Sequence, residues 1–444
     1  MLRAGMVGMG MIFDETYRPL FERLHRDGLY DPAFGVCGFE LAAVTTRTGQ
    51  RAEAYRRAAG GRIGAFASYQ GADAVTEMLG AATGSSSGGA GTGRLRLPVP
   101  HGNDARQGLD FVCVASPDDR HFEAARAVLT AGKHLLVEKP SVLALTELDE
   151  LQRLAHENGV LAKVVYHKLL DPDHKRLRTL VADGLLRHVN HGYCSLLEPK
   201  SIGGGQFSEW IAGRNPGTYV AVHYIKLIDF TFGGRLRSVA CTGQRGIVGP
   251  ADGNTWDSTQ LRLIYGYDDG REAAFDIHTS WVTPDNFPGY VEQEVQFRFD
   301  NGVWTAHGRK RGVECTIEGR TPQPLKITPN HHYNAECLEP WGERSVRGYG
   351  LEAIERFVRE VALVEFGGPP EERPRRLEAA RALQYNDLAA DRQTVAAVQA
   401  MEAILARHAA GVPDAVVKVN HDAGGLVMFS PGAAEPELLY AGRV

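Results

Sequence analysis

The chain has 444 residues, of which 49 are basic and 54 acidic, and its formal net charge is −5. This length suits two domains, and 43% hydrophobic residues are enough to fill their cores. The balanced charge argues against nucleic acid as a partner, and no apolar run reaches the ~18 to 20 residues that span a membrane. The six cysteines lack paired spacing, and the first strand leaves no room for a signal peptide, so we expect a cytoplasmic protein with reduced thiols.

Strand and helix patterns alternate through residues 1–163. This alternation is typical of parallel βαβ units and predicts a doubly wound Rossmann sheet. A Gly/Ser-rich stretch at 84–93 predicts a flexible surface insertion within about residues 80–108, at the amino-terminal edge of the sheet. The expected strands are 2–7, 40–45, 111–115, 134–137 and 161–166, and the expected helices are 48–59, 72–79, 119–132 and 145–158.

A glycine-rich turn follows the first expected strand. Gly8 and Gly10 let the backbone turn tightly and approach a pyrophosphate, whose charge would lie at the positive end of the next helix. Phe13 stands where the usual fingerprint has a third glycine, so we expect an irregular turn there. The turn predicts a dinucleotide site that includes Gly8, Gly10, Met11 and Ile12.

The second expected strand runs into Thr46 and Arg47, with no carboxylate to hold the ribose hydroxyls of NAD. Arg47 can form charge-assisted contacts with a 2′-phosphate, and Thr46 or Thr48 can add a hydroxyl. NADP is therefore slightly favoured over NAD. The alternative is that Arg47 is merely solvated at the edge of the sheet.

The trio Glu138-Lys139-Pro140 follows the apolar strand at 134–137. Strands of an open α/β sheet present their carboxyl ends to the binding crevice. The ammonium of Lys139 is therefore placed to polarise or protonate a substrate oxygen.

From about residue 164 to 444 the pattern predicts a second, α+β domain with a large, open, mostly antiparallel sheet. Turn signals at 268–270 and 300–302 indicate antiparallel neighbours. Leu261, Leu263 and Tyr265 alternate along one strand, so helices or a second subunit must cover the face that they form. The expected strands are 260–267, 272–280, 291–299 and 313–318, and helices at 351–365 and 375–408 are expected to pack back on the first domain.

The glycine turn, the Ala115-Ser116-Pro117 segment with His121, and the Glu138-Lys139-Pro140 trio together resemble the Gfo/Idh/MocA family of oxidoreductases, which includes proteins like glucose-fructose oxidoreductase and inositol dehydrogenase. The resemblance implies NAD(P)-dependent hydride transfer between nicotinamide and a hydroxyl or carbonyl of a sugar, glycoside or cyclitol, and a homodimer or homotetramer. It gives Lys139 contacts with both nicotinamide and substrate. The other residues that it places at the cofactor are Ser116, Pro117, His121 and Glu138.

The family's second motif, Asp-x-Gly-x-His, resembles the stretch 219–223, where Tyr219 replaces the aspartate and Ala221 the glycine. The spacing of four puts Tyr219 and His223 on one helical face. The resemblance implies that His223 accepts a proton, Lys139 orients the hydroxyl and Tyr219 assists. Lys226 or Lys139 would then lower the tyrosine pKa. The alternative is that His223 is a core histidine.

Three further residues are candidates for contact with the substrate. His167 and Lys168 follow the strand at 161–166 and could bind ring hydroxyls, although a surface ion pair is as good an explanation for Lys168. Trp210 could stack on a sugar face or act as a hydrophobic anchor. Adjacent histidines at 331 and 332 lack the spacing of a metal site.

Two other functions stay open. A catalytically silent regulator of the same fold would bind the dinucleotide without turnover. An enzyme that retains its nicotinamide could instead oxidise one hydroxyl and reduce another within one cycle.

Overall fold

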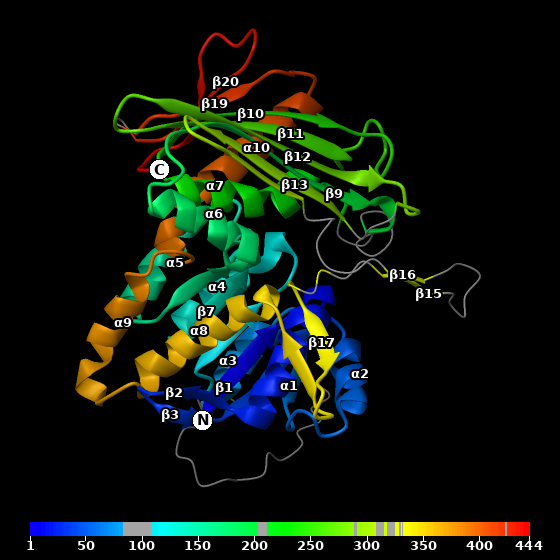
Figure 1. The fold of residues 1–444 in the computed structure, drawn as a ribbon, viewed down its shortest axis with the longest axis vertical. Helices are drawn as coiled ribbons and strands as arrows, with labels where there is room; N and C mark the ends of the chain where they lie inside the picture. The colour runs from blue at the N-terminus through cyan, green and yellow to red at the C-terminus, as the bar shows by residue number, and fades with distance from the viewer. Residues whose placement is uncertain are drawn as a thin grey trace.

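The computed structural model describes residues 1–82, 108–202, 211–287, 291–307, 315–317, 325–327, 330, 332–421 and 424–444. The predicted Gly/Ser insertion lies outside these residues. Two sheets dominate the fold, and Figure 1 shows helices α6 (Pro172–Ala182) and α7 (Val222–Phe232) lying between them.

The first sheet has six strands, all parallel, in the order β5-β4-β1-β6-β7-β8. This is the predicted doubly wound Rossmann sheet, in which the chain order reverses beside β1. The short, half-exposed strand β5 was not predicted, because only two of its residues are partly buried. The strands are β1 (Leu2–Val7), β4 (Phe39–Thr46), β5 (Ala67–Gln70), β6 (Phe111–Val114), β7 (His134–Glu138) and β8 (Ala162–Val165).

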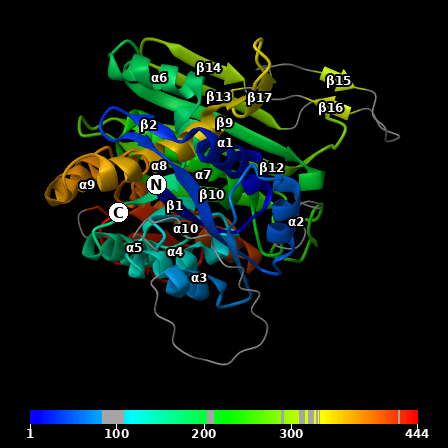
Figure 2. The same ribbon diagram turned by 90° about the horizontal axis from the view of Figure 1, so that it is seen from below.

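Helices cover both faces of this sheet. Figure 2 shows α3 (Ala74–Ala82), α4 (His121–Thr130) and α5 (Leu145–Glu157) on one side of β1, and α1 (Arg18–Asp27) and α8 (Tyr349–Phe366) on the other. Helix α2 (Gln50–Ala59) shares the core of α1 and α8. The ring centroids of Phe111 and Phe357 lie 5.5 Å apart. Helix α8 therefore packs against the first sheet.

The second sheet has nine strands and is mostly antiparallel. Only β12 (Glu272–Thr283) and β9 (Val189–Pro199) pair in parallel. Both predicted turns join antiparallel neighbours, as the sequence indicated. The order is β14-β13-β9-β12-β11-β10-β19-β20-β21, and the other strands are β10 (Arg235–Gln244), β11 (Ser258–Gly266), β13 (Glu292–Phe299), β14 (Val303–His307), β19 (Val416–Val419), β20 (Leu426–Phe429) and β21 (Glu437–Tyr440).

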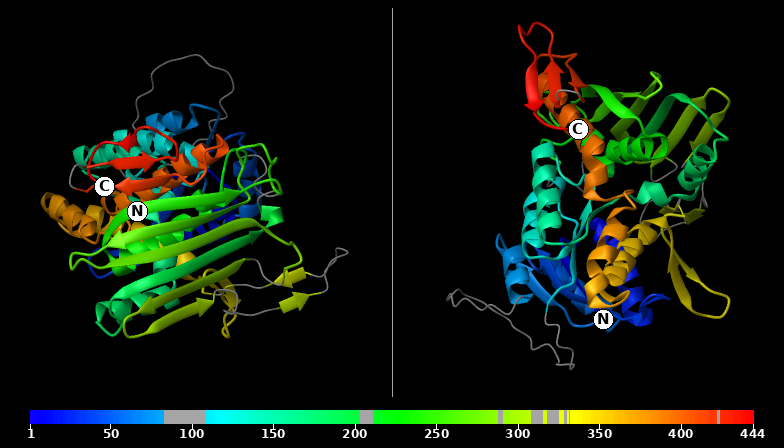
Figure 3. Two further views of the ribbon diagram at one scale, coloured as in Figure 1. Left: turned by 90° about the horizontal axis from the view of Figure 1, so that it is seen from above. Right: turned by 90° about the vertical axis from the view of Figure 1, so that its left-hand side faces the viewer.

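The inner face of this sheet packs against helices of the same chain. Leu261, Leu263 and Tyr265 are at most 1% exposed and share a core with α7 and α10 (Arg392–Ala409). The outer face is turned to the viewer at the left of Figure 3. It carries polar pairs such as Arg262 and Asp276, whose Nε and Oδ1 atoms lie 2.8 Å apart. Helices of the same chain therefore cover the apolar inner face, which is one of the two coverings expected from the sequence. A homodimer or homotetramer stays a prediction from resemblance alone.

Two expected elements differ from the structure. The helix expected over 375–408 is two helices, α9 (Arg373–Arg381) and α10. Between them Gln384 adopts a left-handed φ of 46°, and the side chain of Asp387 accepts a hydrogen bond from the Ala389 amide and starts a 3₁₀ turn. The strand expected at 313–318 is β15 (Cys315–Ile317), which pairs only with β16 (Leu325–Ile327) outside the large sheet.

Several short strands were also missed. Strands β2 (Leu29–Asp31) and β3 (Gly35–Cys37) form a hairpin beside α1, and β17 (Ala335–Leu338) and β18 (Arg344–Arg347) form another. Each is three or four residues long, which is too short for a periodic pattern to show.

Candidate active site

The predicted glycine turn lies at the carboxyl end of β1. Gly8 has a φ of +89°, and a Cβ there would lie 2.4 Å from the Ala115 carbonyl oxygen, so only glycine fits. A Cβ on Gly10 would meet no atom within 4 Å. Met11 and Ile12 begin the helix that follows, so its amide groups face the turn. The open side at Gly10 fits the close approach of a phosphate group.

Phe13 changes the helix after this turn. Residues Phe13–Tyr17 form a π-helical turn, η1, before α1 begins. The Phe13 side chain is completely buried, with its ring centroid 5.3 Å from that of Tyr55. The irregular turn expected from the missing third glycine is therefore present.

Thr46 and Arg47 lie at the end of β4, on the other side of the cofactor turn. The Thr46 hydroxyl accepts a 3.0 Å hydrogen bond from the Gly49 amide, which leaves it as a donor toward a ligand. Arg47 is exposed. Arg51, which was not predicted as a site residue, donates to the Met9 carbonyl oxygen at 3.0 Å, and its guanidinium lies 3.2 Å from the Asp14 carboxylate. Two arginines therefore flank the turn.

Ser116, Pro117 and His121 follow β6. The Ser116 hydroxyl oxygen is buried and has no hydrogen-bond partner within the described part of the chain. The His121 ring nitrogens lie 2.8 Å from the carbonyl oxygens of Ser116 and Pro140. His121 therefore ties the loop after β6 to the loop after β7, and it supports the cofactor site from behind the strand ends.

Strand β7 ends at Glu138, and Lys139 follows it. The Glu138 carboxylate is buried and accepts a 2.9 Å hydrogen bond from the Tyr17 hydroxyl. Burial raises the pKa of Glu138 to about 7, although Lys139 and Tyr17 oppose this shift. The ammonium of Lys139 donates a 2.5 Å hydrogen bond to the Tyr219 carbonyl oxygen and lies 4.1 Å from the centroid of that ring.

Tyr219 lies in a π-helical turn, η5 (Gly217–Ala221), that leads into α7 and His223. The Nδ1 atom of His223 is buried and has no hydrogen-bond partner among the described residues. Burial lowers the pKa of His223 well below its usual value, and the charge of Lys139 lowers it further. His223 is therefore neutral near pH 7 and can accept a proton.

His167 begins the 3₁₀ turn η3 (His167–Leu170), and its ring centroid lies 6.4 Å from that of His223. Its Nδ1 atom donates to the Gly350 carbonyl oxygen at 3.2 Å. Burial, with the nearby charge of Lys139, lowers the pKa of His167 to about 3. Its Nε2 atom is therefore an unprotonated acceptor, and it has no hydrogen-bond partner in the described chain.

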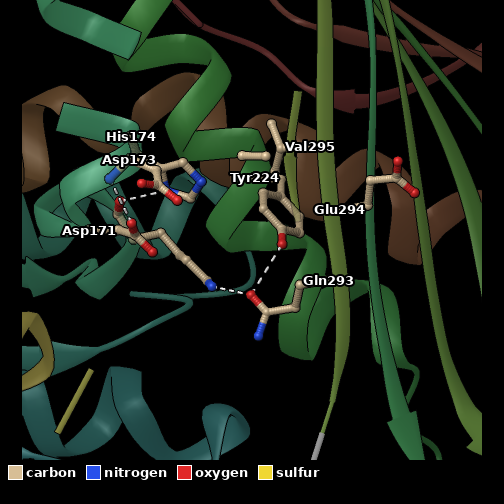
Figure 4. Close-up of a pocket in the computed structure, with 9 residues that line it drawn as sticks. Asp171, Asp173, His174, Tyr224, Gln293, Glu294 and Val295 are labelled. Atoms are coloured by element: carbon tan, nitrogen blue, oxygen red, sulfur yellow. Dashed lines mark hydrogen bonds between the residues drawn. The ribbon is translucent and has the colours of Figure 1, made fainter. Parts of the chain in front are cut away.

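Lys168 is nearly buried, and its ammonium is hydrogen-bonded to the Gln293 side chain. Both residues line a small pocket beside α6 and α7. Figure 4 shows the Tyr224 hydroxyl and the Gln293 amide pointing toward each other in this pocket, 3.5 Å apart. Lys168 is thus buried and does not lie on the surface. Trp210 lies outside the described residues.

Lys226 was predicted to lie near Tyr219, but its contacts are with other residues. Its ammonium is hydrogen-bonded to the Ala390 carbonyl oxygen and lies 3.6 Å from the Asp229 carboxylate. Only Lys139, of the two lysines considered, contacts the tyrosine.

Two residues near Lys139 were not predicted. Glu198 lies near the end of β9, on the inner face of the strand. The preceding inward-facing residues, Cys194 and Leu196, are apolar. The Glu198 carboxylate accepts a 2.9 Å hydrogen bond from the indole of Trp281, on β12. A glutamate at the end of an alternating apolar pattern was the available signal. Its partner could not be read from the sequence, because the pairing of β9 with β12 is not local.

The described residues contain no group of three or more His, Cys, Asp or Glu side chains that could hold a metal ion. They also contain no helix that is long and apolar enough to cross a membrane.

Comparison with known proteins gives matches over both halves of the chain. The Gfo/Idh/MocA model, described as an oxidoreductase family with an NAD-binding Rossmann fold, matches residues 2–166. D-xylose dehydrogenase of Paenarthrobacter nicotinovorans is 35% identical over 301 residues, which are 63% of this chain and 74% of that protein. The scyllo-inositol 2-dehydrogenase (NADP(+)) IolW of Bacillus subtilis is 34% identical over 82 residues, 18% of this chain and 23% of that protein.

Several other curated matches are also short, and three of the strongest cover only 23% to 28% of the relative's length. Among solved structures, an inositol dehydrogenase homologue from Azotobacter vinelandii, complexed with NADH and myo-inositol, has a TM-score of 0.60 at 18% identity. The likeness covers 91% of this chain and 96% of that one, and at this identity it shows the fold.

Proposed function

This chain belongs to the Gfo/Idh/MocA family of oxidoreductases, and on that premise we propose that it is an NAD(P)-dependent dehydrogenase acting on the CH–OH group of a sugar, glycoside or cyclitol. The observation that carries the proposal is the meeting of one ammonium and two neutral imidazoles in the same site. Lys139 supplies the ammonium, and His167 and His223 each have a buried ring nitrogen without a hydrogen-bond partner among the described residues. A polyhydroxylated ligand has the donors and acceptors to satisfy them.

The cofactor would be held at the ends of β1 and β6. The turn for the pyrophosphate would consist of Gly8, Gly10, Met11 and Ile12. The buried Ser116 hydroxyl could form a hydrogen bond with the cofactor. Pro117, His121 and Glu138 shape the adjacent loops. When bound, the nicotinamide accepts or supplies the hydride.

NADP is the proposed cofactor, with NAD the alternative. Arg47 offers a positive charge and Thr46 a hydroxyl at the end of β4, and Arg51 adds a second positive charge near the turn. The curated relative IolW is named for NADP, whereas the Azotobacter homologue was crystallised with NADH.

The proposed proton path uses only side chains that meet in the site. During oxidation Lys139 donates a hydrogen bond to the substrate hydroxyl oxygen, and the hydroxyl proton moves to Nδ1 of the neutral His223. The ring of Tyr219 holds the Lys139 ammonium in position. In the reverse direction the protonated His223 returns the proton to the alkoxide as the carbonyl is reduced.

His167 and Lys168 are the proposed substrate contacts. The unprotonated Nε2 atom of His167 can accept a hydrogen bond from a second hydroxyl of the ring. Lys168 and Gln293 lie at the adjoining pocket, where polar groups can distinguish one sugar from another. Relatives named for inositols and D-xylose support this class of substrate.

The test has two stages. Binding of NADPH, NADP, NADH and NAD is first measured by calorimetry, and absorbance of reduced nicotinamide is then followed with D-xylose, myo-inositol and scyllo-inositol. We expect Lys139→Met and His223→Ala each to lower kcat/KM at least 100-fold, and we expect His223→Ala to leave cofactor binding within about twofold. Lys133→Met, at the other end of β7, is the matched control and should retain activity.

Two results would contradict the proposal. Tight cofactor binding without turnover on any of these substrates would favour the catalytically silent regulator. Nicotinamide that stays bound through purification and exchanges hydride between two added sugars would favour the cycle without cofactor release.

A further inference from the structure

A second buried carboxylate, besides that of Glu138, acts on Lys139. The side chain of Glu198 is on the inner face of the large sheet and is 8% exposed. Its Oε2 atom accepts the indole hydrogen bond of Trp281, which is completely buried. The parallel register of β9 and β12 shifts between Ser280 and Thr283, and this irregularity lies where the two side chains meet.

Trp281 connects Glu198 to the catalytic lysine. The Trp281 ring centroid lies 6.2 Å from that of Tyr219, and the Lys139 ammonium lies over the same tyrosine ring. Both aromatic rings are packed, so neither side chain can move without disturbing the other. Successive contacts therefore link Glu198 through Trp281 and Tyr219 to Lys139.

Several charged groups act on Lys139. Burial lowers the pKa of its ammonium, and the carboxylates of Glu138, Glu198 and Asp118 oppose this shift. Three imidazoles, those of His121, His167 and His223, feel the lysine charge in turn. Burial raises the pKa of Glu198 to about 7, against the effect of Lys139 and Trp281. The protonation of Lys139 and the protonation of Glu198 therefore depend on each other.

We propose that Glu198 is a positioning residue that keeps Lys139 protonated, so that its ammonium can donate a hydrogen bond to the substrate oxygen. Tyr219 stands at the aspartate position of the family motif, so the turn before α7 provides no carboxylate there. Glu138 is engaged by the Tyr17 hydroxyl, and its Oε1 atom lies 3.9 Å from His167. Glu198 has one oxygen held by Trp281, and this hydrogen bond also stabilises its anionic form. The catalytic consequence rests on the proposed dehydrogenase function, whereas the effect on the charge of Lys139 does not.

The first test measures the charge of Lys139 without turnover. The protein is labelled with trace acetic anhydride at a series of pH values, and mass spectrometry of the Lys139 peptide gives the midpoint of its reactivity. Glu198→Gln should move this midpoint to lower pH by about one unit, because a negative neighbour is removed. Glu272→Gln is the matched control, since this exposed carboxylate lies at the other end of the strand that carries Trp281, and its midpoint should be unchanged.

A second variant keeps the test decisive if Glu198→Gln fails to fold. Trp281→Phe retains the glutamate but removes its donor, which raises the Glu198 pKa and should move the Lys139 midpoint in the same direction by a smaller amount. Circular dichroism and urea midpoints establish that each variant is folded. An unchanged Lys139 midpoint in a folded Glu198→Gln variant would overturn the proposal, as would a shift to higher pH.

The second test follows catalysis on D-xylose or an inositol. In Glu198→Gln the alkaline limb of kcat/KM should move to lower pH with the labelling midpoint, and Glu272→Gln should keep the profile of the unmodified protein. A purely structural role of Glu198 would lower activity at every pH without moving that limb. Absence of turnover on these sugars would count against the proposed function alone, because the labelling shift requires no substrate.

Discussion

The ammonium of Lys139 lies 4.1 Å from the centroid of the Tyr219 ring and is hydrogen-bonded to the carbonyl oxygen of the same residue. This contact joins the end of a Rossmann strand to the turn η5 that leads into α7, 80 residues away. A cation over an aromatic face is stabilised by the ring itself, and the phenolic hydroxyl contributes little.

The contact predicts different outcomes for two substitutions of Tyr219. Tyr219→Phe keeps the ring and the backbone carbonyl, so we expect kcat/KM within about twofold of the unmodified protein. Tyr219→Ala removes the ring and should lower kcat/KM about tenfold, which corresponds to ~1.4 kcal/mol. Steady-state kinetics on D-xylose or an inositol measures both. If Tyr219→Phe loses as much activity as Tyr219→Ala, the hydroxyl takes part in catalysis.

Arg47 provides a test of cofactor preference. Arg47→Ala should weaken NADPH binding about tenfold or more, because a charge-assisted contact with the 2′-phosphate is lost, and should leave NADH binding within about twofold. Calorimetry with both nucleotides gives the two Kd values. Arg57→Ala, on an exposed turn of α2, is the control for a general loss of positive charge. Equal weakening of NADPH and NADH would contradict recognition of the 2′-phosphate by Arg47.

A buried ion pair joins β8 to α8. The Lys163 ammonium and the Glu360 carboxylate are 2.8 Å apart, and both side chains are at most 1% exposed. Glu360→Gln leaves the buried Lys163 ammonium without its carboxylate and should cost about 3 to 5 kcal/mol of unfolding free energy. Lys163→Met leaves Glu360 its ion pair with Arg356, 2.8 Å away, and should cost less. The double variant Lys163→Met with Glu360→Met should recover most of this loss.

Urea unfolding followed by circular dichroism tests this prediction. Glu157→Gln is the control, because its ion pair with Arg153 is on the surface of α5 and should contribute less than ~1 kcal/mol. A double variant that is less stable than either single variant would show that the pair is worth more than apolar packing at the same place.

Glu365 predicts how stability depends on pH. Its carboxylate accepts hydrogen bonds from His134 at 3.0 Å and from the Arg373 Nε atom at 2.8 Å. The Leu161 amide donates to the Nδ1 atom of His134, so the proton of the neutral ring is on the nitrogen that faces Glu365. Burial alone would raise the pKa of Glu365, but these hydrogen bonds lower it to about 2.

A carboxylate whose pKa is lower in the folded state stabilises the fold above its unfolded pKa, and this contribution is lost as the pH falls through the folded pKa. Glu365→Gln should therefore cost about 3 kcal/mol between pH 7 and 5, and the difference from the unmodified protein should narrow below about pH 4.5. Urea midpoints at pH 7, 5, 4 and 3.5 measure it, with the exposed Glu371→Gln as control. A difference that widens toward acid pH would contradict this assignment.

Local patterns in the sequence predicted much of the first domain. Short apolar runs and helical spacings placed β1, β4, β6, β7 and β8 within about one residue, because strands buried on both faces are continuously apolar. Gly8 could be identified because a tight turn with a positive φ requires glycine, and Lys139 because it follows a strand that ends at the crevice. The family followed from these motifs together.

Tertiary structure decided what depends on contacts between distant residues. The sequence marked Leu261, Leu263 and Tyr265 as one apolar face but could not show that helices of the same chain cover it. It predicted one helix where Gln384 and Asp387 break the chain, because side-chain caps compete with helical periodicity. Trp281 reaches Glu198 only through the pairing of β12 with β9, between residues more than 80 positions apart. Local spacing determines which elements form, whereas the charge of a site depends on which distant side chains the fold buries together.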